Sequence, residues 1–275
     1  MWILIWKRFA RSKLARVALL YVAIVTVIAI AAPLIAPNQY KTDLIHRLSP
    51  PDSQHRLGTD DLGRDVLSRM IHGARVSLAV GFAATALSLI VGSFFGAIAG
   101  YYGGAADWIV SRLIEIVLCF PFLFLVLGIV ALFQPSMATI MIALGLTSWT
   151  TEARYVRGEV LRVREMEFAQ AARASGASDA RIIFRHLLPN ALAPVLVSAS
   201  FGVANAILVE SALSFLGLGV SVPTPSWGSI LSVAETFIDY AWWLVLFPGL
   251  AIFTTVAAFN VIGDRFRDAL DPRSD

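Results

Sequence analysis

The stretch Val76–Tyr102, with the sequence VSLAVGFAATALSLIVGSFFGAIAGYY, is 27 residues long and contains no charged side chain. A helix needs about 20 apolar residues to cross a bilayer core that is about 30 Å thick. This stretch therefore predicts a membrane-spanning helix. Glycines recur in it at positions 92, 96 and 100, a spacing that lets helices approach closely. We expect this ridge to pack inside the chain, with contact to a second membrane subunit as the alternative.

Five further uncharged runs lie on either side of this one. Only 15% of the 275 residues are charged and 57% are hydrophobic, whereas soluble domains usually carry about 25% charged residues. The runs are Val17–Ala36, Ile116–Phe133, Pro135–Thr151, Leu187–Val209 and Ala241–Ile262. The sequence thus predicts an all-α, polytopic membrane protein with six transmembrane helices. Pro121 and Pro248 are expected to kink the third and sixth, because proline removes a backbone hydrogen bond.

The segment Ser211–Ala234 is also uncharged, but it does not read as a seventh straight span. It contains Pro223 and Pro225 as well as three glycines, and these residues interrupt helices. We interpret its first part as the end of the fifth span and the remainder as a loop. Whether residues 220–235 re-enter the membrane stays open.

The distribution of Lys and Arg predicts which loops share a side. Five precede Val17, seven lie in residues 152–190 and three follow Ile262. Basic residues near span ends favour the cytoplasm, so residues 1–16, the loop 152–190 and the tail 263–275 are predicted to be cytoplasmic. Residues 37–75 fall outside by parity although they carry six basic residues. The first span is expected to be a retained anchor, and the net charge of +3 reflects topology instead of nucleic-acid binding.

The sequence offers no catalytic, metal or cofactor site. None of the three lysines follows the glycine pattern of a phosphate-binding loop, and H-E-x-x-H is absent. Asp60, Asp61 and Asp65 lack the spacing of a calcium loop, and Asp65 is expected to pair with Arg69 one helical turn away. The single cysteine, Cys119, excludes an intrachain disulfide. ATP-driven work would need a separate subunit.

The loop 152–190 is predicted to contain two short helices joined by a glycine. Glu165–Ala174 is rich in alanine, and Gly176 stands where a helix commonly ends in a left-handed turn. Ser178 is then expected to cap a second helix, Asp179–Leu188, which Pro189 closes. Such a compact knob suits a groove on another protein. An ordinary solvated loop is an equally good interpretation of the pattern alone.

This loop resembles a known signature. Gln170-Ala171-Ala172, Gly176 and Leu188-Pro189 match the spacing of E-A-A-x₃-G-x₉-I-x-L-P, the signature of binding-protein-dependent ABC transporter permeases. Gln170 replaces the signature Glu and His186 stands at the usual Ile position. The run AARASGASDARIIFRHLLPN is similar to the dipeptide, oligopeptide and nickel branch of the family. Three further blocks resemble its second permease subunit: His55–Arg69, Glu210–Gly228 and Phe247–Arg273.

The resemblance implies a type I ABC importer permease fold in a bacterial cytoplasmic membrane. It implies four kinds of partner: a second, homologous permease, two ATP-binding subunits, an extracytoplasmic solute-binding protein and the lipid bilayer, with no nucleic acid. It also implies that Gln170, Ala171, Ala172, Gly176, His186, Leu188 and Pro189 couple the permease to its ATPase. A peptide substrate is favoured, with nickel and glutathione as alternatives.

Two hypotheses from other classes compete with this one. A secondary transporter without an ATPase would need charged residues inside the membrane, and only Glu210 and Glu115 are candidates. Glu210 follows a long uncharged run, so it could line the translocation path or mark the outer interface. An intramembrane enzyme is disfavoured because no nucleophile or metal constellation is present.

Overall fold

The computed structural model describes residues 2–37, 40–220 and 223–270, and these residues are mostly helical. The helices are α1 (Trp2–Arg11), α2 (Lys13–Ile35), η1 (Leu44–His46), α3 (Val66–Tyr102), α4 (Gly104–Leu118), α5 (Phe122–Phe133), α6 (Met137–Val163), α7 (Glu167–Ala174), α8 (Asp179–Arg181), the π-helix η2 (Ile182–Leu187), α9 (Leu188–Phe215), α10 (Trp227–Phe237) and α11 (Trp243–Leu270). The predominance of helices among the described residues confirms the all-α prediction.

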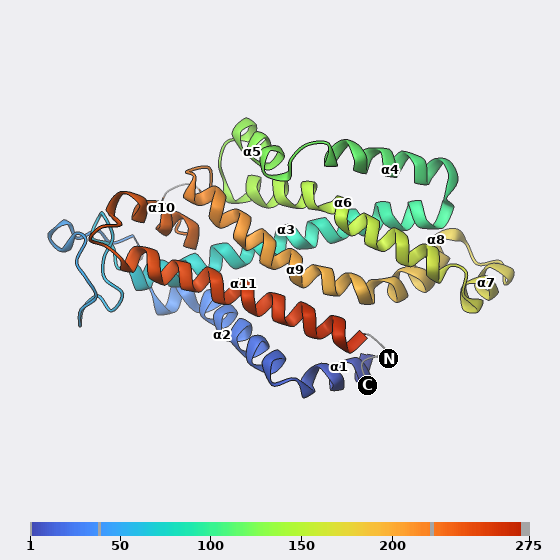
Figure 1. The fold of residues 1–275 in the computed structure, drawn as a ribbon, viewed down its shortest axis with the longest axis horizontal. Coiled ribbons are helices and arrows are strands. Elements are labelled where there is room, and N and C mark those ends of the chain that lie inside the picture. The colour runs from blue at the N-terminus through green and yellow to red at the C-terminus, as the bar shows by residue number, and fades with distance from the viewer. Residues whose placement is uncertain (1, 38–39, 221–222, 271–275) are drawn as a thin grey trace.

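The long helices run side by side along the long axis of the molecule (Figure 1). The loop that carries α7, the helix α1 and the C-terminal end of α11 lie toward one end of this axis. Residues 40–65 and α10 lie at the other end. Helix α3 has 37 residues, which corresponds to about 55 Å. It is longer than a bilayer core is thick, so it connects the two ends.

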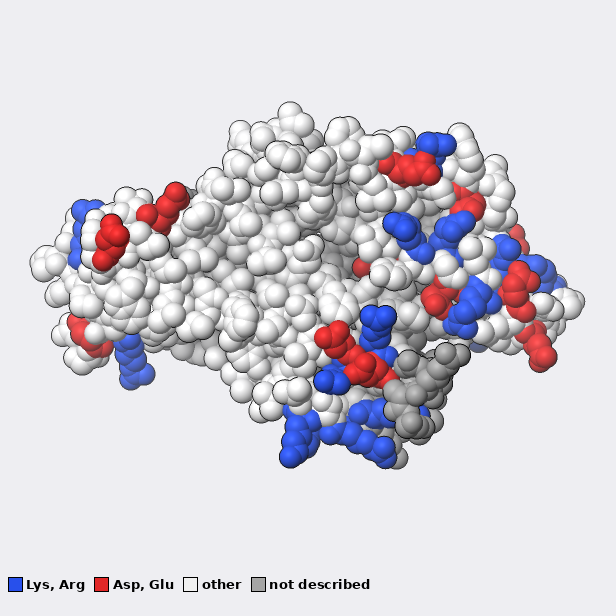
Figure 2. Space-filling view, viewed as in Figure 1, with Lys and Arg blue, Asp and Glu red and all other residues white. Residues whose placement is uncertain are grey.

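Among the described residues, four helices are long and apolar enough to cross a membrane, namely α2, α3, α9 from Pro194 onward and α11. The count is five if α4 and α5 form one bent span. Charged side chains gather toward the two ends of the molecule and leave an uncharged band between them (Figure 2). Helix α6 falls outside this set, because its second half carries charges, so its status as the sixth span stays a prediction.

Two of the predicted boundaries differ from the structure. Helix α3 begins at Val66, ten residues before the uncharged run, and α6 continues to Val163, well past Thr151. The region 152–163 is therefore the end of a long helix and not part of an irregular loop. At Pro121 the chain does more than kink: α4 ends at Leu118, α5 begins at Phe122, and the two differ in direction by 83°.

The glycine ridge of α3 packs against α6 within this chain, as predicted. A β-carbon at Gly92 would lie 2.5 Å from the β-carbon of Glu152, and one at Gly96 would lie 2.5 Å from the carbonyl oxygen of Ala153. A β-carbon at Gly100 would lie 2.9 Å from the carbonyl oxygen of Arg157. The backbones of the two helices are thus in direct contact along three turns, which only glycine allows.

The segment before α3 is organised around a buried carboxylate. Asp60 accepts hydrogen bonds from the Nε of Arg64 at 2.7 Å and lies 3.3 Å from the Nε of Arg69. Both arginines are buried with it, so two of the six basic residues of this region are paired inside the protein. The predicted Asp65–Arg69 pair is wrong. Asp65 instead caps α3 by accepting from the backbone N–H of Ser68 at 2.8 Å.

The uncharged segment 211–234 does not form a seventh span. Helix α9 ends at Phe215, and the short helix α10 follows at Trp227. Helix α10 has 11 residues, or about 16 Å, which is half the thickness of a bilayer core. The indole N–H of Trp227 donates to the carbonyl of Met70, which fastens α10 to α3. Residues 221–222, within the segment 220–235 considered for re-entry, lie outside the described residues.

Candidate functional site

The turn after α7 has the geometry that the sequence predicts. Gly176 adopts a φ of +77°, a left-handed conformation that costs other residues energy. Its N–H donates to the carbonyl of Arg173, and the N–H of Ala177 donates to that of Ala172. This pair of bonds is a Schellman motif, which satisfies the last carbonyls of a helix. No heavy atom would lie within 4 Å of a β-carbon at Gly176, so the glycine is needed for its backbone conformation.

The second half of the loop differs from the prediction. Ser178 occupies the N-cap of α8, but its side chain makes no capping hydrogen bond. Helix α8 leads into the π-helix η2 and then directly into α9. Pro189 does not close a helix; it lies in the first turn of α9. Proline cannot donate a backbone bond, and the wider π turn, in which the N–H of Leu188 donates to the carbonyl of Ile183, accommodates it.

The loop is fastened to the ends of α3 and α6. Ala169, Ile182 and Leu187 are buried in one apolar cluster with Val160 of α6 and Tyr101 of α3. The hydroxyl of Tyr101 donates to a carboxylate oxygen of Asp179 at 2.6 Å. The guanidinium of Arg173 lies 5.4 Å from the centroid of the same ring, a distance that allows a cation–π attraction. These contacts attach the loop to α3 and α6.

The outer face of the loop is exposed. Phe184 is 61% exposed and Phe168 is 39% exposed, so two aromatic rings face away from the core. The amide of Gln170 donates to the backbone carbonyl of Glu165 at 3.0 Å. The signature residues divide by exposure: Gln170, Ala171, Gly176 and Pro189 are exposed, and Ala172, His186 and Leu188 are half-buried. Sequence reasoning missed Phe168 and Phe184, although apolar side chains in a polar loop are the signal for them.

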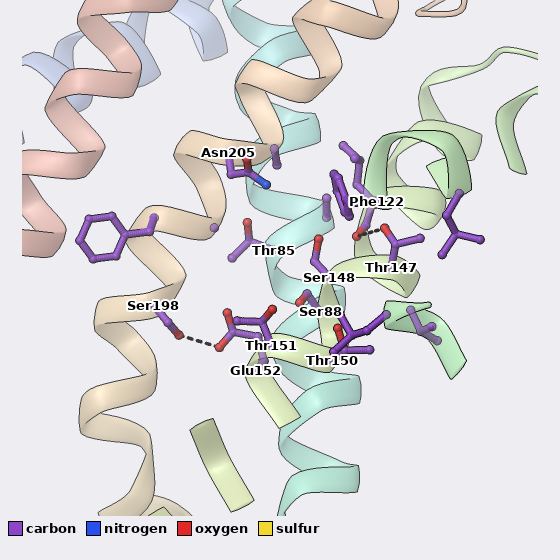
Figure 3. Close-up of a pocket in the computed structure, with 18 of the residues that line it drawn as sticks. Thr85, Ser88, Phe122, Thr147, Ser148, Thr150, Thr151, Glu152, Ser198 and Asn205 are labelled. Carbon is purple, nitrogen blue, oxygen red and sulfur yellow. Dashed lines mark hydrogen bonds between the residues drawn. The ribbon is translucent and has the colours of Figure 1, made fainter. Parts of the chain in front are cut away.

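A cavity of about 420 Å³ lies in the middle of the helix bundle. One wall is apolar and comes from the region where α4 breaks and α5 begins, including Phe122. The opposite walls come from α3, α6 and α9, and they carry the polar side chains Thr85, Ser88, Thr147, Ser148, Thr150, Thr151, Glu152, Ser198 and Asn205 (Figure 3). The cavity is thus lined by hydroxyl groups together with one carboxylate.

Glu152 supplies this carboxylate. It is 6% exposed, and its carboxylate accepts a hydrogen bond from the hydroxyl of Ser198 at 2.6 Å (Figure 3). Gly92 leaves the space for its β-carbon between α3 and α6. Sequence reasoning missed Glu152, which was assigned to the start of the loop 152–190. The run of hydroxyl residues just before it, from Thr147 to Thr151, was the available signal.

Glu210 lies elsewhere. Its side chain is completely buried, and its carboxylate accepts from the hydroxyls of Ser77 at 3.0 Å and Ser214 at 2.7 Å. It is not among the residues that line the cavity. Glu115, the other acid considered for ion coupling, is exposed and pairs with Arg112. The structure therefore brings the signature residues together in one loop, and it places Glu210 in a separate, buried hydroxyl cluster.

Comparison with models of protein families shows to which family the chain belongs. Residues 92–275, which include the loop and most of the residues that line the cavity, match the model of the "binding-protein-dependent transport system inner membrane component". The chain belongs to that family. Residues 1–51 of this permease also match the "N-terminal TM domain of oligopeptide transport permease C". The permease is therefore a multi-pass inner membrane protein and the membrane component of an ABC system, which works with ATPase and binding-protein partners.

Its curated relatives cover the whole chain. The permease is 46% identical over 269 residues to the "Dipeptide transport system permease protein DppC" of Alkalihalophilus pseudofirmus, which covers 98% of this chain and 88% of the relative. It is 39% identical over 274 residues to the "Oligopeptide transport system permease protein OppC" of Bacillus subtilis, with 98% and 90% covered. Because 98% of the chain is aligned, both alignments span the signature loop and the helices around the cavity.

Two solved structures have a similar fold. An inward-facing MetNI methionine ABC transporter aligns with a TM-score of 0.58 at 20% identity, over 73% of this chain and 96% of that chain. An amino acid ABC transporter crystallised with histidines aligns with a TM-score of 0.53 at 17% identity, over 74% and 93%. At these identities the similarity is one of fold, and it identifies the type I ABC importer permease fold that the sequence predicts.

Proposed function

We propose that this permease forms part of the pathway by which an ATP-driven importer brings dipeptides and oligopeptides into the cell. The observation that carries the proposal is the 39–46% identity, over nearly the whole chain, to proteins named as dipeptide and oligopeptide permeases. The hydroxyl-lined cavity supports it, because hydroxyls both donate to and accept from the peptide groups that all such substrates share.

The proposal includes an orientation. Residues 1–16, the part of the predicted loop 152–190 that follows α6, and the tail 263–275 face the cytoplasm, and residues 37–75 face outward. Residues 17–36 form the first membrane span. Residues 76–262 form the core, which contains the other five spans. This arrangement is supported by the Lys and Arg counts and by the position of α1, α7 and the end of α11 toward one end of the molecule (Figure 1). Residues 271–275 lie outside the described residues.

We further propose that the permease pairs with a second, homologous permease above two ATP-binding subunits, and that a solute-binding protein delivers the peptide from outside. The loop around α7 is the contact to one ATPase. Its exposed aromatic rings, Phe168 and Phe184, supply apolar area for docking. Its attachment to α3 through Tyr101 and Asp179 carries the motion into the bundle. Gln170, without the charge of the signature Glu, contributes hydrogen bonding alone.

Reconstitution tests the substrate. The complete complex would be placed in vesicles with its binding protein, and ATP hydrolysis and accumulation would be measured with a dipeptide, a pentapeptide, nickel ions or glutathione. We expect a peptide to stimulate hydrolysis and to accumulate only when ATP is present. Stimulation by nickel or glutathione alone would replace the peptide proposal, and accumulation without the ATPase would support a secondary transporter.

Substitutions at Gly176 test the role of the loop. Valine at a φ of +77° costs about 1–2 kcal/mol in backbone strain, so Gly176→Val should distort the turn and abolish coupled uptake while membrane insertion persists. Gly176→Asn should retain most activity, because asparagine tolerates this conformation. Gly158→Ala in α6, which also has open space around it, is the matched control. Normal coupled uptake by Gly176→Val would contradict the docking role.

A further inference from the structure

One acidic side chain lines the cavity. Of the side chains that line it, Glu152 is the one carboxylic acid, and none is a lysine, arginine or histidine. Its partner is the hydroxyl of Ser198, which does not neutralise a charge. Acidic groups at membrane depth are costly and are retained where they serve a function. The wall is therefore built to attract a cation.

Two hydroxyls that line the same cavity as this carboxylate have no partner in the described part of the chain. The Oγ1 of Thr85 and the Oγ of Ser88 are buried and make no hydrogen bond, and both residues are more than nine-tenths buried. They lie one turn apart on α3 and line the same cavity as Glu152 (Figure 3). Buried polar atoms are normally satisfied, so unpaired hydroxyls that border a cavity are available to accept hydrogen bonds from a bound ligand.

The chemistry of the set selects the kind of cation. One carboxylate surrounded by hydroxyls offers oxygen acceptors, and it lacks the imidazole or thiolate ligands that suit nickel. An ammonium group donates three hydrogen bonds, which matches one carboxylate and two hydroxyl oxygens. Every unmodified peptide carries such a group at its N-terminus whatever its side chains are. An α-ammonium site would thus serve peptides of varied sequence.

We propose that Glu152, together with Thr85 and Ser88, binds the N-terminal ammonium group of the peptide as it passes through the permease. This inference rests on the proposed peptide function. Gly92 positions the acid, because a side chain at that position would collide with the β-carbon of Glu152. Ser198 orients the carboxylate from α9. The apolar wall near Phe122 is left to contact the side chains of the peptide.

Binding to the complete, nucleotide-free transporter tests the inference without the selectivity of the binding protein. A tritiated dipeptide and its N-acetylated form would be compared by scintillation proximity. An ionic contact of this kind is worth about tenfold or more in affinity, so the wild-type complex should prefer the free amine by about that factor. Glu152→Gln should reduce the preference to near unity, and Glu152→Asp should retain part of it. Glu159→Gln, which changes a half-buried acid on the same helix that pairs with Arg162 and does not line the cavity, should leave the preference unchanged.

Several outcomes separate this inference from the proposed function. If wild-type vesicles import dipeptides but the wild-type complex binds both forms equally, the inference is overturned and the peptide function stands. An unchanged preference in Glu152→Gln would overturn it too. Retained ATP hydrolysis by Glu152→Gln, stimulated by the binding protein, would show that the variant is assembled. If the wild-type complex imports no peptide, the proposed function itself fails.

Discussion

Replacement of Gly96 by alanine tests the contact between α3 and α6. The new β-carbon would lie 2.5 Å from the carbonyl oxygen of Ala153, whereas ordinary contact begins at 3.4 Å. The helices would have to separate locally by about 0.9 Å, because the obstacle is backbone and cannot rotate away. A gap of about 0.5–1 Å forfeits a quarter to a half of the dispersion attraction along the interface.

The size of the effect follows from two opposing contributions. Overpacking costs about 1–3 kcal/mol, and a blocked backbone points to the upper part of that range. Alanine recovers up to about 1 kcal/mol of helix propensity. The net loss is about 1–2 kcal/mol, which corresponds to a melting temperature lower by about 2–8 °C. Thermal unfolding in detergent, followed by tryptophan fluorescence, measures the change in melting temperature. Trp149 is a local reporter, because its ring lies 5.1 Å from that of Phe95, in a tilted arrangement, at the same interface.

Gly128→Ala in α5 is the matched control. No atom would lie within 4 Å of its β-carbon, so alanine there adds helix propensity alone and should raise the melting temperature slightly or leave it unchanged. A melting temperature for Gly96→Ala equal to or above that of Gly128→Ala would refute the close contact between the two helices.

Two further substitutions test other contacts. Tyr101→Phe removes the hydroxyl that donates to Asp179, which should weaken the attachment of the loop to α3 by about 0.5–1.5 kcal/mol. We therefore expect fewer peptides to be moved per ATP hydrolysed in vesicles. Tyr102→Phe is the control and should have no effect, because that ring is exposed. Asp60→Asn leaves two buried guanidinium groups without their carboxylate, and we expect a loss of stability of about 3–5 kcal/mol. Faster proteolysis of the segment before α3 would measure this loss. Asp61→Asn is the control: its contact with Arg64, at 3.4 Å, is partly exposed, so its loss should cost under about 1 kcal/mol. Equal effects in either pair would contradict the assignment.

The positions of the long helices could be predicted because a bilayer excludes charge. The same signal fails at helix ends, since hydropathy detects the membrane and not the helix. Helix α3 therefore begins ten residues before Val76, and α6 continues twelve residues past Thr151, where charged side chains remain helical outside the apolar run. The break before Phe122 was visible as a proline, but its angle of 83° depends on what α5 packs against.

In the site, too, the local features could be predicted from the sequence, whereas those that depend on packing could not. The turn at Gly176 is local, so the residue type predicts it. The course of the chain at Pro189 depends on Leu187, which is buried in the cluster with α6 and so holds a π turn in place. The predicted pairing of Asp65 with Arg69 was wrong because a residue at an N-cap turns its side chain back to the helix backbone. Glu152 was missed because it stands at the end of an uncharged run, where counting alone assigns it to the loop.

The backbone contact between α3 and α6 has a mechanical consequence. With glycines at 92, 96 and 100 against the neighbouring helix, rotation of either helix about its axis would bring side chains into the other backbone. The pair can therefore move only as one rigid unit. Thr85, Ser88 and Glu152 all belong to it, as does Tyr101 at its far end. A displacement applied at Tyr101 changes the distance from this unit to α5 and α9 while it preserves the spacing of the three groups, so the cavity can widen or narrow without dismantling its polar face.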